Sequence, residues 1–173
     1  MKKTLVLVAL LASSVYAKSL TKSQTFIGLD VGYSQVKGYI NDNNTLKYKS
    51  DSDKQYGFRI GAQNEEWRTT FIFGYYDNGD TNQNVEEYLL TVDYFLTNSQ
   101  NTLKPYIGVN VGYANYESDL VKDESGVVYG AQVGFSVDVA EHFNVDLSYR
   151  YSVTGYDEFD HIGGVMFGMN YLF

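Results

Sequence analysis

The segment from Phe143 to Val153 (FNVDLSYRYSV) changes between apolar and polar at every successive position. Phe, Val, Leu and Tyr stand at the odd positions, and Asn, Asp, Ser and Arg stand at the even positions. A strand places alternate residues on opposite faces, whereas a helix of about 3.6 residues per turn would mix the two sets on every face. The segment therefore predicts a β-strand with one apolar face and one polar face.

The same two-residue period recurs along most of the chain. It gives eight segments, of which the third is the least regular: 27–33, 56–63, 67–76, 87–94, 107–113, 127–139, 143–153 and 165–173. Their lengths are near the roughly 9–11 residues that a tilted membrane-crossing strand requires. Every apolar run after Ala17 is broken by polar residues, so any membrane-spanning structure in this chain must be built from strands.

The connections between these segments alternate in length. The short ones are 64–66, 97–102 and 140–142, and the long polar ones are 35–54, 77–84, 114–126 and 154–160. Short turns on one side, long loops on the other and an even strand number are typical of bacterial outer-membrane barrels. We therefore predict an all-β protein, an eight-stranded antiparallel up-and-down transmembrane β-barrel, with the short turns and both termini on the periplasmic side.

The first residues of the chain have the pattern of an export signal. Lys2 and Lys3 precede a short apolar run at 5–12 (LVLVALLA), and 15–17 (VYA) is a candidate cleavage site. We expect residues 1–17 to be a signal peptide and residues 18–173 to form the outer-membrane barrel. An uncleaved anchor helix is the alternative, but the run is shorter than the roughly 20 residues that a spanning helix needs.

Charge and cysteine content exclude other classes of protein. The 173 residues include 13 basic and 21 acidic residues and no cysteine. Loss of the two lysines of the signal peptide leaves the mature chain with a net charge of −10. Nucleic-acid binding requires a basic face, so we expect no nucleic-acid partner. Because no disulfide can form, a closed hydrogen-bonded barrel is the expected source of stability.

Aromatic residues gather near the ends of the predicted strands. Those near the loop ends are Tyr33, Tyr56, Tyr75, Tyr88, Tyr113, Tyr129 and Tyr151. Those near the short-turn ends are Phe26, Trp67, Phe95, Tyr106, Phe143, Tyr171 and Phe173. Two aromatic girdles at the lipid headgroup boundaries are characteristic of outer-membrane barrels, so we expect these rings to form them.

The polar face of the strands carries charged residues that would lie inside such a barrel: Asp30, Arg59, Arg68, Glu87, Asp93, Asp146 and Arg150. An eight-stranded barrel has an interior that side chains just fill, and buried charges must be paired. We therefore expect a lumen network in which Arg59 and Arg150 bridge several carboxylates, and in which Arg150 contacts one of Asp30, Glu87, Asp93 or Asp146. A gated ion path or small-solute channel is the alternative.

No catalytic, cofactor or metal site is predicted. A rim site made of His161, Ser152 and Glu158 or Asp160 is the one enzymatic alternative, since a Ser–His pair with an orienting acid can act on lipid. Nothing in the spacing enforces that arrangement. The acidic loops could bind Ca²⁺ or Mg²⁺ through oxygen ligands, although solvated loops are the favoured interpretation.

Three segments carry a resemblance to a known family. Residues 105–114 (PYIGVNVGYA) resemble the central strand, and 143–151 (FNVDLSYRY) the seventh strand, of the opacity-protein and OmpA/OmpX-type small barrels. Residues 165–173 resemble their terminal strand, which alternates apolar residues and stops on Phe. A soluble lipocalin-like barrel is a weaker alternative, because it would need an apolar interior.

The resemblance implies a non-enzymatic protein of the cell envelope with a structural or surface-interaction role. It implies a monomer in contact with outer-membrane lipid and lipopolysaccharide, with external loops that could bind a surface ligand. It also implies that the final strand, with Tyr171 and Phe173, is an assembly signal read by the barrel-assembly machinery.

Overall fold

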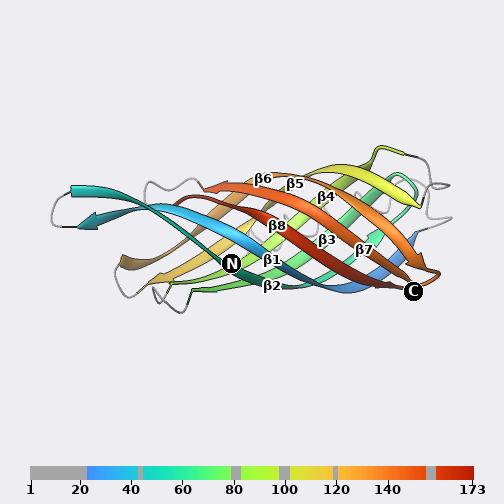
Figure 1. Ribbon diagram of the computed structural model, residues 1–173, viewed down its shortest axis with the longest axis horizontal. Helices are drawn as coiled ribbons and strands as arrows, with labels where there is room; N and C mark the ends of the chain where they lie inside the picture. Colours follow the sequence, from blue (N-terminus) through green and yellow to red (C-terminus); the bar gives the residue numbers. More distant parts are fainter. Residues whose placement is uncertain (1–22, 43–44, 79–82, 98–101, 119–120, 155–158) are drawn as a thin grey trace, which may run out of the picture.

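The computed structural model describes residues 23–42, 45–78, 83–97, 102–118, 121–154 and 159–173. These residues form eight strands in chain order: β1 (Gln24–Asp42), β2 (Thr45–Gln63), β3 (Trp67–Asn78), β4 (Gln83–Phe95), β5 (Leu103–Ser118), β6 (Val121–Ala140), β7 (Phe143–Thr154) and β8 (Phe159–Leu172). Each strand pairs antiparallel with the next, and β8 pairs with β1 from Leu172 opposite Phe26 onward. The strands thus close into a barrel, which leaves no strand edge open to lipid along its wall (Figure 1).

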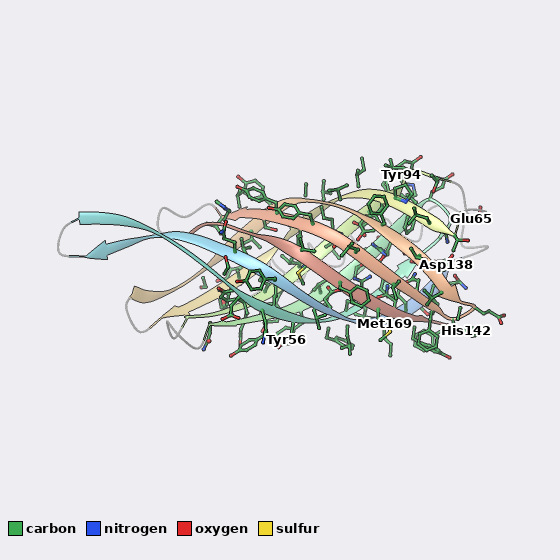
Figure 2. All side chains as sticks on the ribbon, in the orientation of Figure 1. Tyr56, Glu65, Tyr94, Asp138, His142 and Met169 are labelled. Carbon is green, nitrogen blue, oxygen red and sulfur yellow. The ribbon has the colours of Figure 1, made fainter. Side chains whose placement is uncertain are left out.

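Two short turns define one end of the barrel. In the β2–β3 turn, the Asn64 side chain accepts hydrogen bonds from the backbone N–H groups of Glu66 and Trp67, at 2.8 and 2.7 Å. Such local bonds let Asn replace backbone partners in a tight turn. Figure 2 places Glu65, Asp138 and His142 at this end, which we assign as periplasmic because the short turns of outer-membrane barrels lie there.

The external ends of the strands are longer than predicted. Residues 35–54 were expected to be a polar loop, but β1 continues to Asp42 and β2 begins at Thr45, so that the two strands form a long hairpin. Likewise β5 runs to Ser118 and β6 begins at Val121. A strand that extends beyond the membrane meets water on both faces, so its sequence loses the apolar face that identifies a strand.

The apolar face of the strands points outward. Leu29 is 60% exposed and Val109 63%, values expected for aliphatic side chains that meet lipid. In Figure 2 the labelled Tyr56, Tyr94 and Met169 lie on the outside of the wall. In the part of the chain that the structure describes, no helix has the length and hydropathy needed to cross a membrane.

Three aromatic residues expected in the periplasmic girdle lie inside the barrel instead. Phe26, Phe95 and Tyr106 are all buried. Each stands next to an outward-facing residue, such as Ile27 beside Phe26, so the two-residue period turns its ring inward. Position near a strand end was therefore not enough to assign them to the girdle.

The interior has layers of different chemistry. A cluster of apolar side chains lies toward the external end, where Tyr76 of β3 faces Val85 of β4: Ile72, Tyr76, Val85, Leu89, Ala114, Val128 and Ile162. Buried charged and amide side chains occupy the middle of the barrel. Phe95 and Tyr106 pair next to the β4–β5 turn and lie at the periplasmic end. The interior was predicted to be polar, so the apolar cluster is an addition to that expectation.

Candidate functional site

The seven charged residues predicted to line the lumen all face the interior and are buried. Six of them, together with Gln132, form a closed ring of contacts across the lumen. In order around the ring they are Asp30, Arg59, Asp146, Arg68, Asp93, Gln132 and Arg150. Six strands supply these seven residues, because each inward position of a pleated wall aims its side chain at the barrel axis.

Asp146 is the residue on which two arginines converge. Arg59 donates to Asp30 at 2.7 Å and also to Asp146 Oδ2. Arg68 donates from Nη1 to both carboxylate oxygens of Asp146, at 2.8 and 3.0 Å. Asn170 of β8 donates a further hydrogen bond to Asp146 at 2.9 Å. Removal of this one carboxylate would therefore take one of two carboxylate partners from each of two buried guanidinium groups.

Arg68 connects Asp146 to Asp93 in the ring. Its Nε donates to Asp93 at 2.9 Å while its Nη1 holds Asp146. Its guanidinium also lies 4.5 Å from the centre of the Tyr106 ring and 5.5 Å from that of Phe95, within the range of cation–π contacts. The sequence placed Arg68 in the lumen but assigned the bridging role to Arg59 and Arg150.

Gln132 and Arg150 close the ring. Gln132 donates to Asp93 at 2.5 Å and accepts a hydrogen bond from Arg150 Nε at 3.2 Å. Arg150 Nη2 lies 3.5 Å from Asp30 Oδ2, which is an ion-pair distance beyond that of a good hydrogen bond. Arg150 thus faces inward and contacts Asp30, but it bridges fewer carboxylates than Arg68 does.

Glu87 stands outside the ring. Its Oε2 accepts a hydrogen bond at 2.6 Å from Gln55, whose own oxygen accepts one from Ser34 at 2.5 Å. Its Oε1 is buried without a hydrogen-bond partner among the described residues. The ring itself contains three arginines and three aspartates, so its formal charges balance without Glu87.

Gly168 of β8 makes room for the Arg59–Asp30 contact. A Cβ atom at this position would overlap Arg59 Nη1 and would lie 2.7 Å from Asp30 Oδ1. We expect Gly168→Ala to lower the free energy of unfolding in detergent by about 1–3 kcal/mol, because an overpacked interior must shift to accept the methyl group. Urea denaturation followed by tryptophan fluorescence measures this effect.

Gly74→Ala is the matched control for Gly168→Ala. A Cβ atom there would meet the flexible end of Gln55 at 3.1 Å and Glu87 Oε2 at 3.4 Å, and both can move. We expect a smaller loss than at Gly168. An equal loss at the two glycines would show that packing around the ring is not especially tight.

The Ser–His alternative does not fit the described geometry. Ser152 points into the barrel, where its hydroxyl donates to Asn110 at 2.9 Å. His161 pairs with Val153, and its ring lies 5.0 Å from that of the outward-facing Tyr151. Ser152 and His161 are therefore on opposite faces of the wall and out of hydrogen-bond reach. Glu158, and the side chain of Asp160, lie outside the described residues.

The described residues contain no group of three or more His, Cys, Asp or Glu side chains that could hold a metal ion. Several acidic residues of the external connections, including Asp80, Asp119 and Asp157, lie outside the described residues.

The closed eight-stranded barrel, with lipid outside and charge inside, can be compared with known families. A family model described as the outer membrane protein beta-barrel domain matches residues 4–173. The protein belongs to this family. It is an integral protein of the bacterial outer membrane, which explains the exposed aliphatic face of its strands. A search of the curated proteins found no significant match.

Solved structures of outer-membrane barrels share this fold. Neisserial surface protein A superposes with a TM-score of 0.72 at 18% identity, over 86% of this chain and 97% of that chain. Outer membrane protein H (OprH) from Pseudomonas aeruginosa, solved in DHPC micelles, gives 0.60 at 22% identity over 87% and 99%. The N-terminal barrel domain of OprF from Pseudomonas aeruginosa gives 0.55 at 17% identity over 87% and 100%. At these identities the likeness shows the fold alone.

Proposed function

We propose that this outer-membrane barrel is a non-enzymatic envelope protein that acts through its external strand extensions. We also propose that side chains fill its lumen, so that the barrel is not a general pore for solutes. The observation that carries the proposal is the ring of buried charges across the middle of the barrel, with the apolar cluster around Leu89 on its external side. Side chains of both groups are buried, and an eight-stranded barrel has no spare interior for water.

The proposal includes the remaining expectations about maturation and assembly. Residues 1–17 are removed on export, and the barrel is a monomer in its own membrane, surrounded by lipid and lipopolysaccharide. The closed wall supports the monomer, since β8 pairs with β1 and leaves no edge along the wall for a neighbouring barrel. The barrel-assembly machinery acts on the terminal strand.

Planar-bilayer recording tests the filled lumen. The purified mature protein should give no stable, porin-like open level, because the ring and the apolar cluster leave no continuous aqueous path. A porin reconstituted in the same bilayers serves as the positive control. A large and persistent conductance from this protein would contradict the proposal.

Lipid chemistry gives a second test of the non-enzymatic assignment. Lipopolysaccharide incubated with the folded protein should keep its acyl chains, as measured by mass spectrometry of lipid A. The separation of Ser152 and His161 onto opposite faces of the wall supports this expectation. Loss of an acyl chain that depends on folded protein would favour the enzyme alternative instead.

A further inference from the structure

The β1–β2 hairpin projects beyond the other strands and has an open edge. Within the described residues, β2 pairs with β3 only from Gln55 onward, whereas its pairing with β1 continues back to Thr45. Residues 45–54 of β2 therefore have a strand neighbour on one side only. Figure 1 shows this hairpin reaching past the rest of the barrel, away from the end where the C-terminus lies. An unpaired edge is a template for an added strand.

The charges along this edge are separated by sign. Lys47 and Lys49 are followed by Asp51 and Asp53, all at odd positions of β2 and therefore on one face of the hairpin. The residues directly opposite them on β1 are uncharged: Ile40, Gly38, Val36 and Ser34. The Asp53 carboxylate accepts a hydrogen bond from the backbone N–H of Lys54, and it has no charged residue directly opposite it. In this register none of the four edge charges has a charged residue directly opposite it on β1, and Asp42, opposite Thr45, is the one charged residue on the same face of β1 between residues 34 and 42.

The order of charges along this edge, two lysines and then two aspartates, matches opposite charges when a second copy of the edge runs antiparallel to the first. If a second copy of residues 46–54 lies antiparallel beside the first with Ser50 opposite Ser50, Lys47 faces Asp53 and Lys49 faces Asp51. Two-fold symmetry repeats both pairs, which gives four opposite-charge pairs and no like-charge pair. A shift by two residues in either direction places Lys49 opposite Lys49 or Asp51 opposite Asp51. Opposite-charge pairs directly across strands are stabilising and like-charge pairs are destabilising, so the charges select one register.

Membrane geometry decides where the second copy must be. Antiparallel pairing requires a two-fold axis perpendicular to the strands, and the hairpin continues the long axis of the barrel outward from the membrane (Figure 1). Two barrels that stand upright in one membrane are related by an axis along the membrane normal, which would leave such strands parallel. The partner's barrel therefore lies in a facing membrane, and nine paired residues separate the barrel rims by on the order of 30 Å.

We propose that the open edge of β2 pairs antiparallel with the same edge of a second copy in an opposing membrane, so that the protein joins outer-membrane surfaces. The inference rests on the proposed surface role of the external extensions and names their partner. It is compatible with a monomeric barrel in each membrane. The four edge charges allow only the self-complementary register, which limits pairing with unrelated strands.

Vesicle aggregation with charge-swapped variants tests the proposal. The mature protein is reconstituted into phosphatidylcholine vesicles, and vesicle size is followed by light scattering in EDTA, so that neither lipopolysaccharide nor a divalent cation can bridge the surfaces. Protease accessibility of the hairpin confirms that it faces outward. Wild-type vesicles should aggregate, and high salt should reduce the aggregation.

Two double variants separate edge pairing from other causes of aggregation. K47D/K49D gives an all-acidic edge and D51K/D53K an all-basic edge, so vesicles carrying either variant alone should stay dispersed. Mixed vesicles should aggregate again, because the two edges then form four opposite-charge pairs. K122D, a charge reversal on β6 away from the edge, is the control for net charge and should aggregate like the wild type. The heat-modifiable gel shift verifies that each variant is folded.

Dispersed wild-type vesicles, aggregation of either double variant alone, or failure of the mixture to aggregate would each overturn the proposal. None of these results affects the filled lumen or the absence of lipid chemistry. The bilayer and lipid A measurements test those separately, so a failure of edge pairing is distinguishable from a failure of the proposed function.

Discussion

Replacing Asp146 with alanine should lower the free energy of unfolding of the barrel in detergent by about 3–5 kcal/mol. Asp146 is buried and accepts hydrogen bonds from Arg59, Arg68 and Asn170. Without its carboxylate, two buried guanidinium groups each keep one aspartate, and the charge of the interior rises by one. Loss of one partner from a buried ion pair is far more costly than the pair is stabilising.

Asp138→Ala is the matched control for Asp146→Ala. Asp138 pairs with Lys104 at 2.6 Å, but its side chain is 41% exposed at the periplasmic rim. Exposed ion pairs contribute about 0–1 kcal/mol, so the control should stay close to the wild type in a urea titration. If the two variants were equally stable, the ring would not be an important source of stability for this barrel.

Deletion of Phe173 should severely reduce the amount of folded, membrane-inserted protein. The backbone N–H of Phe173 donates to Thr25 at 2.9 Å, the last bond that joins the end of the chain to the β1 side. Its ring is 60% exposed and packs edge-on against Tyr171 at 5.2 Å, on the lipid face at the periplasmic end. The measurement is the heat-modifiable gel shift of the outer-membrane fraction.

Substitution by aspartate distinguishes a signal from simple lipid burial. Phe143 lies on the same face, and its ring is 5.0 Å from that of Tyr171. A charge near the interface costs little in a barrel, about 0–1 kcal/mol, so Phe143→Asp should assemble nearly normally. Phe173→Asp should fail like the deletion if the assembly machinery reads this ring. Similar folded levels for both variants would refute the signal role.

Many of the lumen residues could be predicted, because successive residues of a strand point to opposite faces, so that the position in the strand decides whether a side chain faces the lumen or the lipid. Once Phe143 to Val153 is recognised as a strand, Asp146 and Arg150 must share a face, and the same rule places Asp30 and Arg68 inside. This alternation does not determine which of the inward-facing charges form ion pairs with one another. Arg68 reaches Asp146 because β3 and β7 face each other across the lumen, and the stagger that closes the barrel brings the two side chains to one level.

The inward position of Phe26 follows from the alternation of side chains along β1 and not from its place near the strand end. The external hairpin has no such signal in the sequence. The sequence of residues 35–54 has no regular apolar alternation, as expected for a strand that meets water on both faces. Its strand character depends on backbone hydrogen bonds between β1 and β2, which no composition signal reports.

The sequence by itself determined the period of two, the number of strands, the apolar outside and the charged inside, since each follows from local alternation and the spacing of turns. Only the tertiary structure decided how far the strands extend, that an apolar cluster around Leu89 covers the charges, and that six charges and Gln132 close into a ring. Contacts across a lumen join residues far apart in the chain. They depend on register and stagger around all eight strands, which is a property of the closed barrel and of no single segment.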